Sequence, residues 1–337
     1  MKINFEHSLA AHCESGVTRS MLRHYGVKIS EPMALGIGAG VFFSYMPFIK
    51  LHGMPVVSFR PLPGHIFARV TRRLGARISS RRFLNKDKAM RALDRLLEKG
   101  TPTGAIVGVF YLPYFPKEYR FHFNAHNICI IGKEGDVYTV SDPVSVVTNE
   151  ISSADLKRVR FAKGTWPPMG KMYWVKHVSS TEPDLRPAIL SGILLNCRRM
   201  LDIPIPFFGV KGIAMLADSM RQWESKLGAR KAALQLAQVI RMLEEIGTGG
   251  AGFRYMYAAF LQEADAVLGG ETGLGIFAVR MTAIGDAWRD FAFEAARKFK
   301  RRSEDVCSYN GLADKLSDIA GLERAFFTDL REAAGKL

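Results

Sequence analysis

The hydrophobic pattern changes near residue 180 and divides the chain into two parts. Before this point, short apolar runs alternate with short segments whose apolar positions follow a helical period. Beyond it, apolar positions recur every three or four residues over long stretches, as they do in helical bundles. The segment Ser179–Pro187, which contains Ser, Thr and Pro, separates the two textures. We therefore predict an α+β fold class, with a sheet-containing domain over residues 1–180 and an all-α domain over residues 184–337.

The first part is expected to mix helices and strands. The segments with helical periodicity are Glu14–Tyr25, Pro63–Leu74, Lys86–Glu98 and residues 152–160. The expected extended segments are Gly40–Tyr45, Val56–Arg60, Ala76–Ser79, Ala105–Tyr111, Ala125–Ile131, Val137–Ser141 and Met172–Val178. The sequence GKEGD at residues 132–136 has the composition of a tight turn, so its two flanking runs are predicted to form a hairpin.

The second part is predicted to be helical. The expected helices are Leu185–Leu201, Gly209–Leu227, Arg230–Glu245, Gly250–Leu268, Leu274–Phe299 and Asn310–Ala334. The glycine-rich run Gly247–Arg254 has two interpretations. It is either a tight turn, in which Gly247 ends one helix and Thr248 caps the next, or a helix N-terminus that binds a phosphate or carboxylate with help from Arg254. The run follows no predicted strand and so is not a nucleotide fingerprint, which favours the turn.

The net charge of +15 is concentrated in the first part of the chain. Residues 1–178 contain 26 Lys and Arg against 12 Asp and Glu, whereas residues 179–337 contain 21 against 20. Residues 69–99 hold 11 of the basic residues, and the candidates for docking among them are Arg72, Arg73, Arg81 and Arg82. The excess is either a solvated helical face or a docking surface for an acidic carrier protein, nucleic acid or an anionic membrane. Nucleic acid ranks last, because the stretch has few aromatic residues and no recognised reader motif.

The composition limits the remaining classes of protein. Hydrophobic residues at 48% and charged residues at 23% are ordinary for a soluble globular protein. The apolar stretches Ala34–Ile49 and Ala188–Leu216 are interrupted by glycine, proline or charge, so no transmembrane segment is predicted, and the N-terminus lacks the apolar core of a secretory signal. The four cysteines show no metal-ligand spacing and no disulfide framework. We expect no metal and no bound cofactor, and a reducing cytoplasm as the location.

Cys13 is the cysteine best placed for chemistry. A cysteine is a nucleophile as the thiolate, so its surroundings must favour negative charge. Cys13 stands directly before Glu14-Ser15-Gly16 at the expected start of the first helix, where the helix dipole and free backbone N–H groups favour an anion. The same N–H groups suit an oxyanion formed by an attacked carbonyl.

A base and its partner are predicted on the hairpin. His126 begins one strand and Asp142 ends the next, and a turn near residues 133–135 would place them opposite each other. His126 would then accept the thiol proton while Asp142 holds the imidazole in one tautomer. Each residue alone has a structural interpretation, as a buried thiol, a core histidine or a turn aspartate, but their order and placement together predict a catalytic site.

These motifs resemble the butirosin biosynthesis protein H N-terminal family, which is related in fold to the bacteriocin-processing cysteine peptidases of the papain-like group. The resemblance is carried by HCESG at residues 12–16 followed by MLRHYG, by His126 in AHNICIIG and by Asp142 in VSDP. The second part, notably Glu245–Arg254, resembles the uncharacterised helical domain commonly fused to that family. The resemblance implies a papain-like domain followed by a helical bundle, with Cys13, His126 and Asp142 as the catalytic residues.

The resemblance also implies an acyltransferase of antibiotic biosynthesis or another branch of secondary metabolism. Such an enzyme takes an acyl or aminoacyl group from the phosphopantetheine thioester of an acidic acyl carrier protein and passes it to an amine. The same site also suits a hydrolase, either a thioesterase or a cysteine peptidase, and a third interpretation is a binding protein without catalysis. Formation of a homo-oligomer stays open.

Two further histidines lie near the nucleophile in sequence. The related peptidases place an oxyanion-donating Gln six residues before the nucleophile, and here this position is His7. His7 either donates through a ring N–H or is a surface residue. His12 adjoins Cys13 and is either structural or in contact with the substrate.

Overall fold

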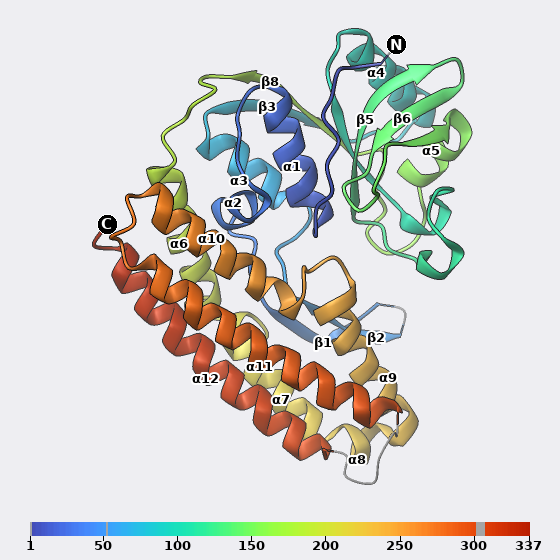
Figure 1. The fold of residues 1–337 in the computed structure, drawn as a ribbon. Helices are drawn as coiled ribbons and strands as arrows, with labels where there is room; N and C mark the ends of the chain where they lie inside the picture. The colour runs from blue at the N-terminus through green and yellow to red at the C-terminus, as the bar shows by residue number, and fades with distance from the viewer. Residues whose placement is uncertain (1, 52, 301–306) are drawn as a thin grey trace. The chain divides into compact units, whose positions relative to one another are not determined.

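The computed structural model describes residues 2–51, 53–300 and 307–337, which form two compact units. We call the first the sheet unit, made of Met1–Ala34 and Pro63–Asp184, and the second the helical unit, made of Leu35–Leu62 and Leu185–Leu337. Figure 1 shows the sheet and its helices in the first unit and long helices in the second. The predicted α+β fold class, with a sheet-containing N-terminal part and a helical C-terminal part, is confirmed.

The sheet unit is built on a six-stranded antiparallel sheet with helices on both faces (Figure 1). In spatial order the strands are β3 (Ala76–Arg81), β8 (Met172–Val178), β4 (Thr103–Val107), β5 (His126–Glu134), β6 (Val137–Ser141) and β7 (Asn149–Ser152). The helices are α1 (Cys13–His24), α2 (Glu31–Ile37), which continues into the helical unit, α3 (His65–Arg73), α4 (Lys86–Glu98) and α5 (Ser153–Arg160). Sequence analysis missed α2 and β7, which are short.

Strands β4 and β5 lie in the middle of the sheet and are covered on both faces. Ile128 and Ile130 of β5 face the core formed with α4 and α5, whereas the alternate residues Asn127 and Cys129 face α1. This double burial explains why both strands appear in the sequence as nearly continuous apolar runs and not as alternating ones.

The β5–β6 hairpin differs from the predicted one in register. Its turn is Gly135–Asp136, and the strands pair Glu134 with Val137 and, after a bulge, Cys129 with Ser141. Continued by one residue, this register places Asp142 opposite Ile128, which is two residues from His126. The prediction that His126 and Asp142 lie directly opposite each other is therefore wrong. The reason is that the turn lies later in the chain than expected, at Gly135–Asp136, and the bulge between Ile130 and Gly132 recovers one residue of this shift.

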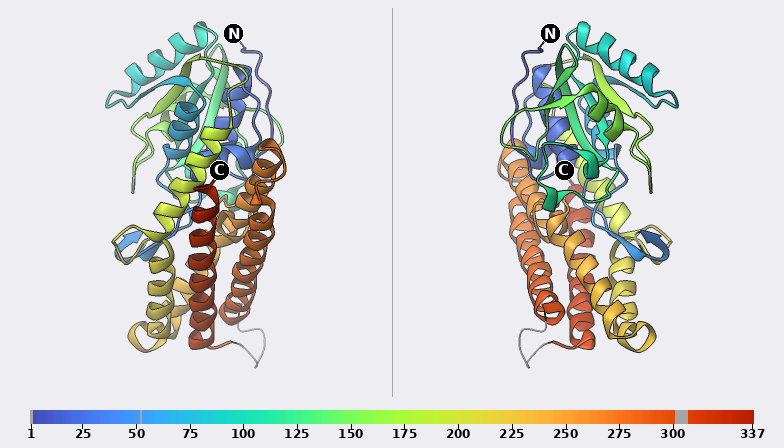
Figure 2. Two further views of the ribbon diagram at one scale, coloured as in Figure 1. Left: turned by 90° about the vertical axis from the view of Figure 1, so that its left-hand side faces the viewer. Right: turned by 90° about the vertical axis from the view of Figure 1, so that its right-hand side faces the viewer.

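The helical unit contains two long helices, α11 (Leu274–Lys300) and α12 (Tyr309–Ala334), which run side by side in Figures 1 and 2. Helix α10 packs on α11, and both α6 and α7 pack on α12. The remaining helices of this unit are α6 (Arg186–Leu201), α7 (Gly209–Arg221), α8 (Trp223–Leu227), α9 (Ala229–Ile240), which ends in a π-helical turn, and α10 (Arg254–Val267). Within the described residues, no helix combines the length and apolar character that crossing a bilayer requires.

The segment Leu35–Leu62 groups with the helices, although sequence analysis placed it in the first domain. It carries the hairpin β1 (Ser44–Leu51) and β2 (Met54–Ser58), so the helical unit is not purely α. The physical reason is burial of its aromatic residues: the rings of Phe43 and Phe59 lie 6.1 and 5.3 Å from that of Trp288 in α11. The backbone joins as well, since the carbonyl of Phe43 accepts a hydrogen bond from Gly209 at the start of α7.

Candidate active site

The turn that presents Cys13 is fixed by a carboxylate from outside the motif. Cys13 is the first residue of α1, and His12 is its N-cap. The Glu31 carboxylate accepts hydrogen bonds from the backbone N–H groups of Ala11 (2.9 Å) and His12 (2.8 Å), and from the hydroxyl of Ser15 (2.9 Å). Glu31 is not among the residues predicted from the sequence, where its only signal is a charged residue at the start of a short helix.

His12 belongs to this cap. Its side chain is buried, and Nδ1 accepts from the backbone N–H of Ser15 at 3.3 Å and lies 3.0 Å from the Ser15 hydroxyl. The structure therefore places His12 in a supporting network at the helix start, in agreement with the structural interpretation.

Gly16 allows the loop after β6 to approach α1. A Cβ atom at position 16 would lie 2.5 Å from the Cβ of Ala10 and 2.7 Å from the Cβ of Pro143. Any larger residue would therefore push away the loop that follows β6, which begins with Asp142. The glycine of the HCESG motif brings the nucleophile and this carboxylate close together.

His126 and Asp142 form a buried pair. The ring Nε2 of His126 lies 2.8 Å from Oδ2 of Asp142, and both side chains are almost fully buried. Asp142 also accepts hydrogen bonds from the Tyr114 hydroxyl to Oδ2 (3.0 Å) and from the backbone N–H of Val144 to Oδ1 (3.2 Å). Tyr114, which sequence analysis missed, comes from the loop before β5 and has no motif of its own.

The other side of the imidazole meets the nucleophile. The Cys13 side chain forms a hydrogen bond with His126, and because Nε2 is directed at Asp142, Nδ1 remains for the thiol. Burial alone would lower the pKa of His126, but the charge and hydrogen bond of Asp142, together with Cys13, outweigh it and raise the pKa to about 10. The geometry therefore favours an imidazolium beside Cys13 at neutral pH.

Tyr114, Cys129 and Cys197 stay protonated at neutral pH. Burial first, and then the charge and hydrogen bond of Asp142, raise the pKa of Tyr114 well above its ordinary value, so Tyr114 remains a donor to the carboxylate. Burial also raises the pKa of the Cys129 thiol, and it raises that of Cys197 to about 12. Neither of these two thiols is a nucleophile at neutral pH.

His7 is not directed at an oxyanion. Its Nδ1 lies 2.8 Å from the hydroxyl of Ser141, and Nε2 donates to the carbonyl of Ser145 at 3.0 Å. Both ring nitrogens are thus occupied, and His7 ties the N-terminal segment to the end of β6 and the loop after it. Of the two interpretations of His7, these contacts favour a structural residue over an oxyanion donor.

Arg254 is a structural residue of the helical unit, so the interpretation as a binding residue is also wrong. It is fully buried, and its Nε and Nη2 donate to the two carboxylate oxygens of Glu323 at 2.8 and 2.9 Å. The indole N–H of Trp288 donates to the same carboxylate at 2.7 Å. A buried arginine in a two-pronged ion pair needs no ligand.

The glycine-rich run before Arg254 is a turn, as the preferred interpretation expected. Gly247, Gly249, Gly250 and Gly252 all have positive φ, which glycine adopts without a steric penalty. Thr248 does not cap α10; its hydroxyl donates to the carbonyl of Leu243 at 2.7 Å and accepts from the backbone N–H of Gly250.

The basic residues predicted for docking lie on α3 and at the end of β3. Arg72, Arg81 and Arg82 are exposed, and Arg73 is half-buried. Partial burial first, and then the neighbouring charges of Arg69 and Arg72, lower the pKa of Arg73 to about 10.

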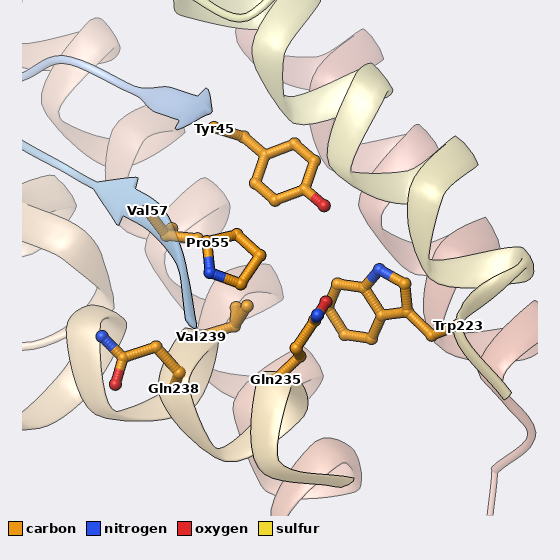
Figure 3. A pocket seen from close by; sticks show the side chains of 7 residues that line it. All are labelled: Tyr45, Pro55, Val57, Trp223, Gln235, Gln238 and Val239. Atoms are coloured by element: carbon orange, nitrogen blue, oxygen red, sulfur yellow. The ribbon is translucent and has the colours of Figure 1, made fainter. Parts of the chain in front are cut away.

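A crevice in the helical unit lies between the β1–β2 hairpin and helices α8 and α9 (Figure 3). Its lining has no carboxylate, imidazole or thiol, so it offers no acid–base chemistry; the residues are Tyr45, Pro55, Val57, Trp223, Gln235, Gln238 and Val239. Among residues 2–51, 53–300 and 307–337, no three His, Cys, Asp or Glu side chains are grouped so that they could hold a metal ion.

Two family models match consecutive parts of the chain. Residues 12–143 match the family model described as butirosin biosynthesis protein H, N-terminal, and residues 154–330 match the model described as domain of unknown function (DUF4872). No curated protein matches the chain. A crystal structure described as a C39-like peptidase from Bacillus anthracis aligns over its full length with 53% of this chain, at 15% identity and a TM-score of 0.38. The resemblance of both parts is confirmed, and since the second match covers more than half of the residues, the chain belongs to the DUF4872 family, with a butirosin biosynthesis protein H N-terminal region in front.

Proposed function

We propose that this protein is an acyltransferase that moves an acyl or aminoacyl group from a carrier-protein thioester, through an acyl-enzyme on Cys13, to an amine. The observation that carries the proposal is the line of contacts from Cys13 to His126 and from His126 to Asp142. An imidazolium beside a thiol favours the thiolate, and a buried carboxylate behind the imidazole keeps it charged and oriented.

In the first half-reaction, the Cys13 thiolate attacks the carbonyl carbon of the donor thioester. The carbonyl oxygen gains negative charge beside the N-terminus of α1, where the helix dipole favours an anion. The bond to the pantetheine sulfur then breaks, and His126 supplies the proton that this leaving thiolate takes up. The products are an acyl-enzyme thioester on Cys13 and a free phosphopantetheine thiol.

In the second half-reaction, an amine attacks the acyl-enzyme. His126, now neutral, takes a proton from the attacking nitrogen, and the bond to the Cys13 sulfur breaks. The amide is released and the thiolate–imidazolium pair is restored. Exchange of one thioester for another is nearly neutral in free energy, whereas amide formation is favourable, so the second step drives the reaction.

The charge distribution supports a carrier protein as the donor. The excess of basic residues is confined to residues 1–178, and Arg72, Arg81 and Arg82 extend into solvent from the sheet unit. Acyl carrier proteins are typically acidic, so an exposed basic surface on the catalytic unit raises their rate of encounter.

The experiment that separates transfer from hydrolysis measures both products. The enzyme is incubated with a panel of acyl and aminoacyl carrier-protein thioesters, with and without a panel of amines, and amide and free acid are quantified by mass spectrometry. We expect amide that requires both the carrier and the amine and that disappears in Cys13→Ala. Release of free acid at the same rate with and without every amine would instead identify a thioesterase.

A further inference from the structure

Asn127, the residue after the catalytic histidine, also contacts the nucleophile. Its side-chain Nδ2 lies 3.8 Å from Sγ of Cys13, within the range of a hydrogen bond to sulfur. Because side chains alternate along β5, Asn127 lies on the α1 face of the sheet, and its neighbour His126 contacts the same thiol. The sulfur is therefore flanked by two donors.

The amide of Asn127 has every polar group in use. It is fully buried, Nδ2 donates to the carbonyl of Ala125 at 3.2 Å as well as to Cys13, and Oδ1 accepts from the Tyr173 hydroxyl at 2.8 Å. A flipped amide would direct its oxygen at the Ala125 carbonyl and its N–H2 group at the Tyr173 hydroxyl. These partners therefore fix Nδ2 on the side of the sulfur.

Tyr173 is held in turn by the strand between it and β5. A Cβ atom at Gly104 of β4 would lie 2.2 Å from the Tyr173 ring, so the ring crosses β4 at the one residue without a side chain. On its other side the ring packs on Phe67, with the centroids 4.5 Å apart. The Tyr173 hydroxyl thereby reaches across β4 to the side chain of Asn127 on β5.

We propose that Asn127 is a catalytic residue that donates a hydrogen bond to the Cys13 thiolate, and that Tyr173 is its positioning residue. A hydrogen bond to a charged acceptor is stronger than one to a neutral acceptor, and the sulfur of a thioester accepts poorly. Asn127 thus favours the thiolate over both the thiol and the acyl-enzyme. This makes Cys13 ionise more readily and makes its sulfur a better leaving group when the amine attacks. The inference rests on the proposed role of Cys13 as the nucleophile.

Alkylation of Cys13 by iodoacetamide tests the inference without any acyl donor. The rate constant at Cys13 is followed by peptide mass spectrometry from pH 5 to 10 in wild type, Asn127→Leu and Tyr173→Phe. Tyr138→Phe is the matched control, because this buried hydroxyl of the same unit donates to Asp94 and has no link to Cys13.

We expect the midpoint of the pH–rate profile to rise by about one pH unit in Asn127→Leu, which lowers the rate roughly tenfold on the acidic limb. Tyr173→Phe should shift it in the same direction by less, and Tyr138→Phe should leave it unchanged. Unchanged midpoints in the folded Asn127→Leu and Tyr173→Phe variants would overturn the inference. If Asn127→Leu does not fold, an unchanged midpoint in Tyr173→Phe is sufficient to overturn it. A His126→Ala variant in the same series separates the two proposals, since an unchanged profile there would refute the thiol–imidazole pair itself.

Discussion

Asp142→Asn tests whether the carboxylate charge of Asp142 is needed to hold His126, or whether any polar side chain at this position is sufficient. The wild-type carboxylate accepts three hydrogen bonds, from His126 and Tyr114 on Oδ2 and from the backbone N–H of Val144 on Oδ1. An asparagine offers one oxygen and one N–H2 group. If the asparagine oxygen faces His126, its N–H2 group faces the backbone N–H of Val144. If the amide is rotated, the N–H2 group faces the donors of His126 and Tyr114. Either orientation leaves a buried donor without an acceptor and removes the charge.

The size of the effect follows from the pKa of His126. Without Asp142, the main influence that raises this pKa is lost while burial still lowers it, so the pKa should fall from about 10 in the wild type toward its ordinary value of 6.5. A change from about 10 to 6.5 corresponds to roughly 5 kcal/mol in favour of the imidazolium. The variant would therefore carry a neutral imidazole at pH 7.5, and turnover should fall by about two to four orders of magnitude.

The pH dependence of stability has a defined sign. Because the pKa of His126 is raised in the folded state, its stabilising contribution is present in full below pH 6.5 and is lost as the pH rises through about 10. In a Cys13→Ala background, where no thiol titrates at the site, the protein should lose up to about 1.4 kcal/mol per pH unit across this window. Cys13→Ala/Asp142→Asn should lack that slope.

Two measurements check these values. An NMR titration of the His126 ring gives its pKa in both variants, and urea unfolding between pH 6.5 and 9.5 gives the slope. Turnover near the wild-type level, or a His126 ring that still titrates near pH 10 in the asparagine variant, would refute the assignment of Asp142 as the orienting residue.

Three further predictions address the loop, the helical unit and the basic surface. Gly16→Ala should lower turnover at least tenfold, because its methyl group displaces the loop after β6, whereas Gly321→Ala, at an open position of α12, should be silent in the same assay. Glu323→Ala should lower the free energy of unfolding in urea by about 3–5 kcal/mol, because it leaves Arg254 charged and buried. Replacement of both Glu323 and Arg254 by apolar residues should lower it by less, and equal losses of stability would contradict this account. Charge reversal of the exposed arginines of α3 and β3 should raise the Michaelis constant for a carrier-bound donor roughly tenfold at low salt, without affecting a small pantetheine thioester. The residues reversed are Arg72, Arg81 and Arg82, and the control reversal on the helical unit changes Arg230, Lys231 and Arg324. Equal effects on both donors, or an equal effect of the control reversal, would exclude docking.

The sequence was informative where local rules decide the structure. Cys13 could be placed at a helix start because it directly precedes Glu14–Tyr25, whose apolar positions follow the period of an amphipathic helix. The β5–β6 hairpin followed from two apolar runs around a Gly–Asp turn. The predicted register was wrong by two residues because two glycines, Gly132 and Gly135, flank the turn in the sequence and the hydrophobic pattern does not show which of them forms it.

Residues that act through distant contacts could not be found in this way. Glu31 fixes the backbone of His12 from 19 positions away, and Tyr114 reaches Asp142 across 28 positions. Segment 35–62 has apolar residues that suit either unit, and only packing on Trp288 decides its place. Conversely, His7 and Arg254 looked available in the sequence because nothing local shows that their polar atoms are already occupied.

The most direct test of the central claim is the intact mass of the enzyme after exposure to acyl carrier-protein thioesters without an amine. The acyl-enzyme should accumulate under these conditions, and an acid quench should preserve it. The account predicts a mass gain equal to the acyl group, mapped by peptide analysis to Cys13, absent in Cys13→Ala and reversed on addition of an accepting amine. Consumption of the donor by the wild-type enzyme with no mass gain at Cys13, or equal consumption by Cys13→Ala, would contradict covalent transfer through this residue.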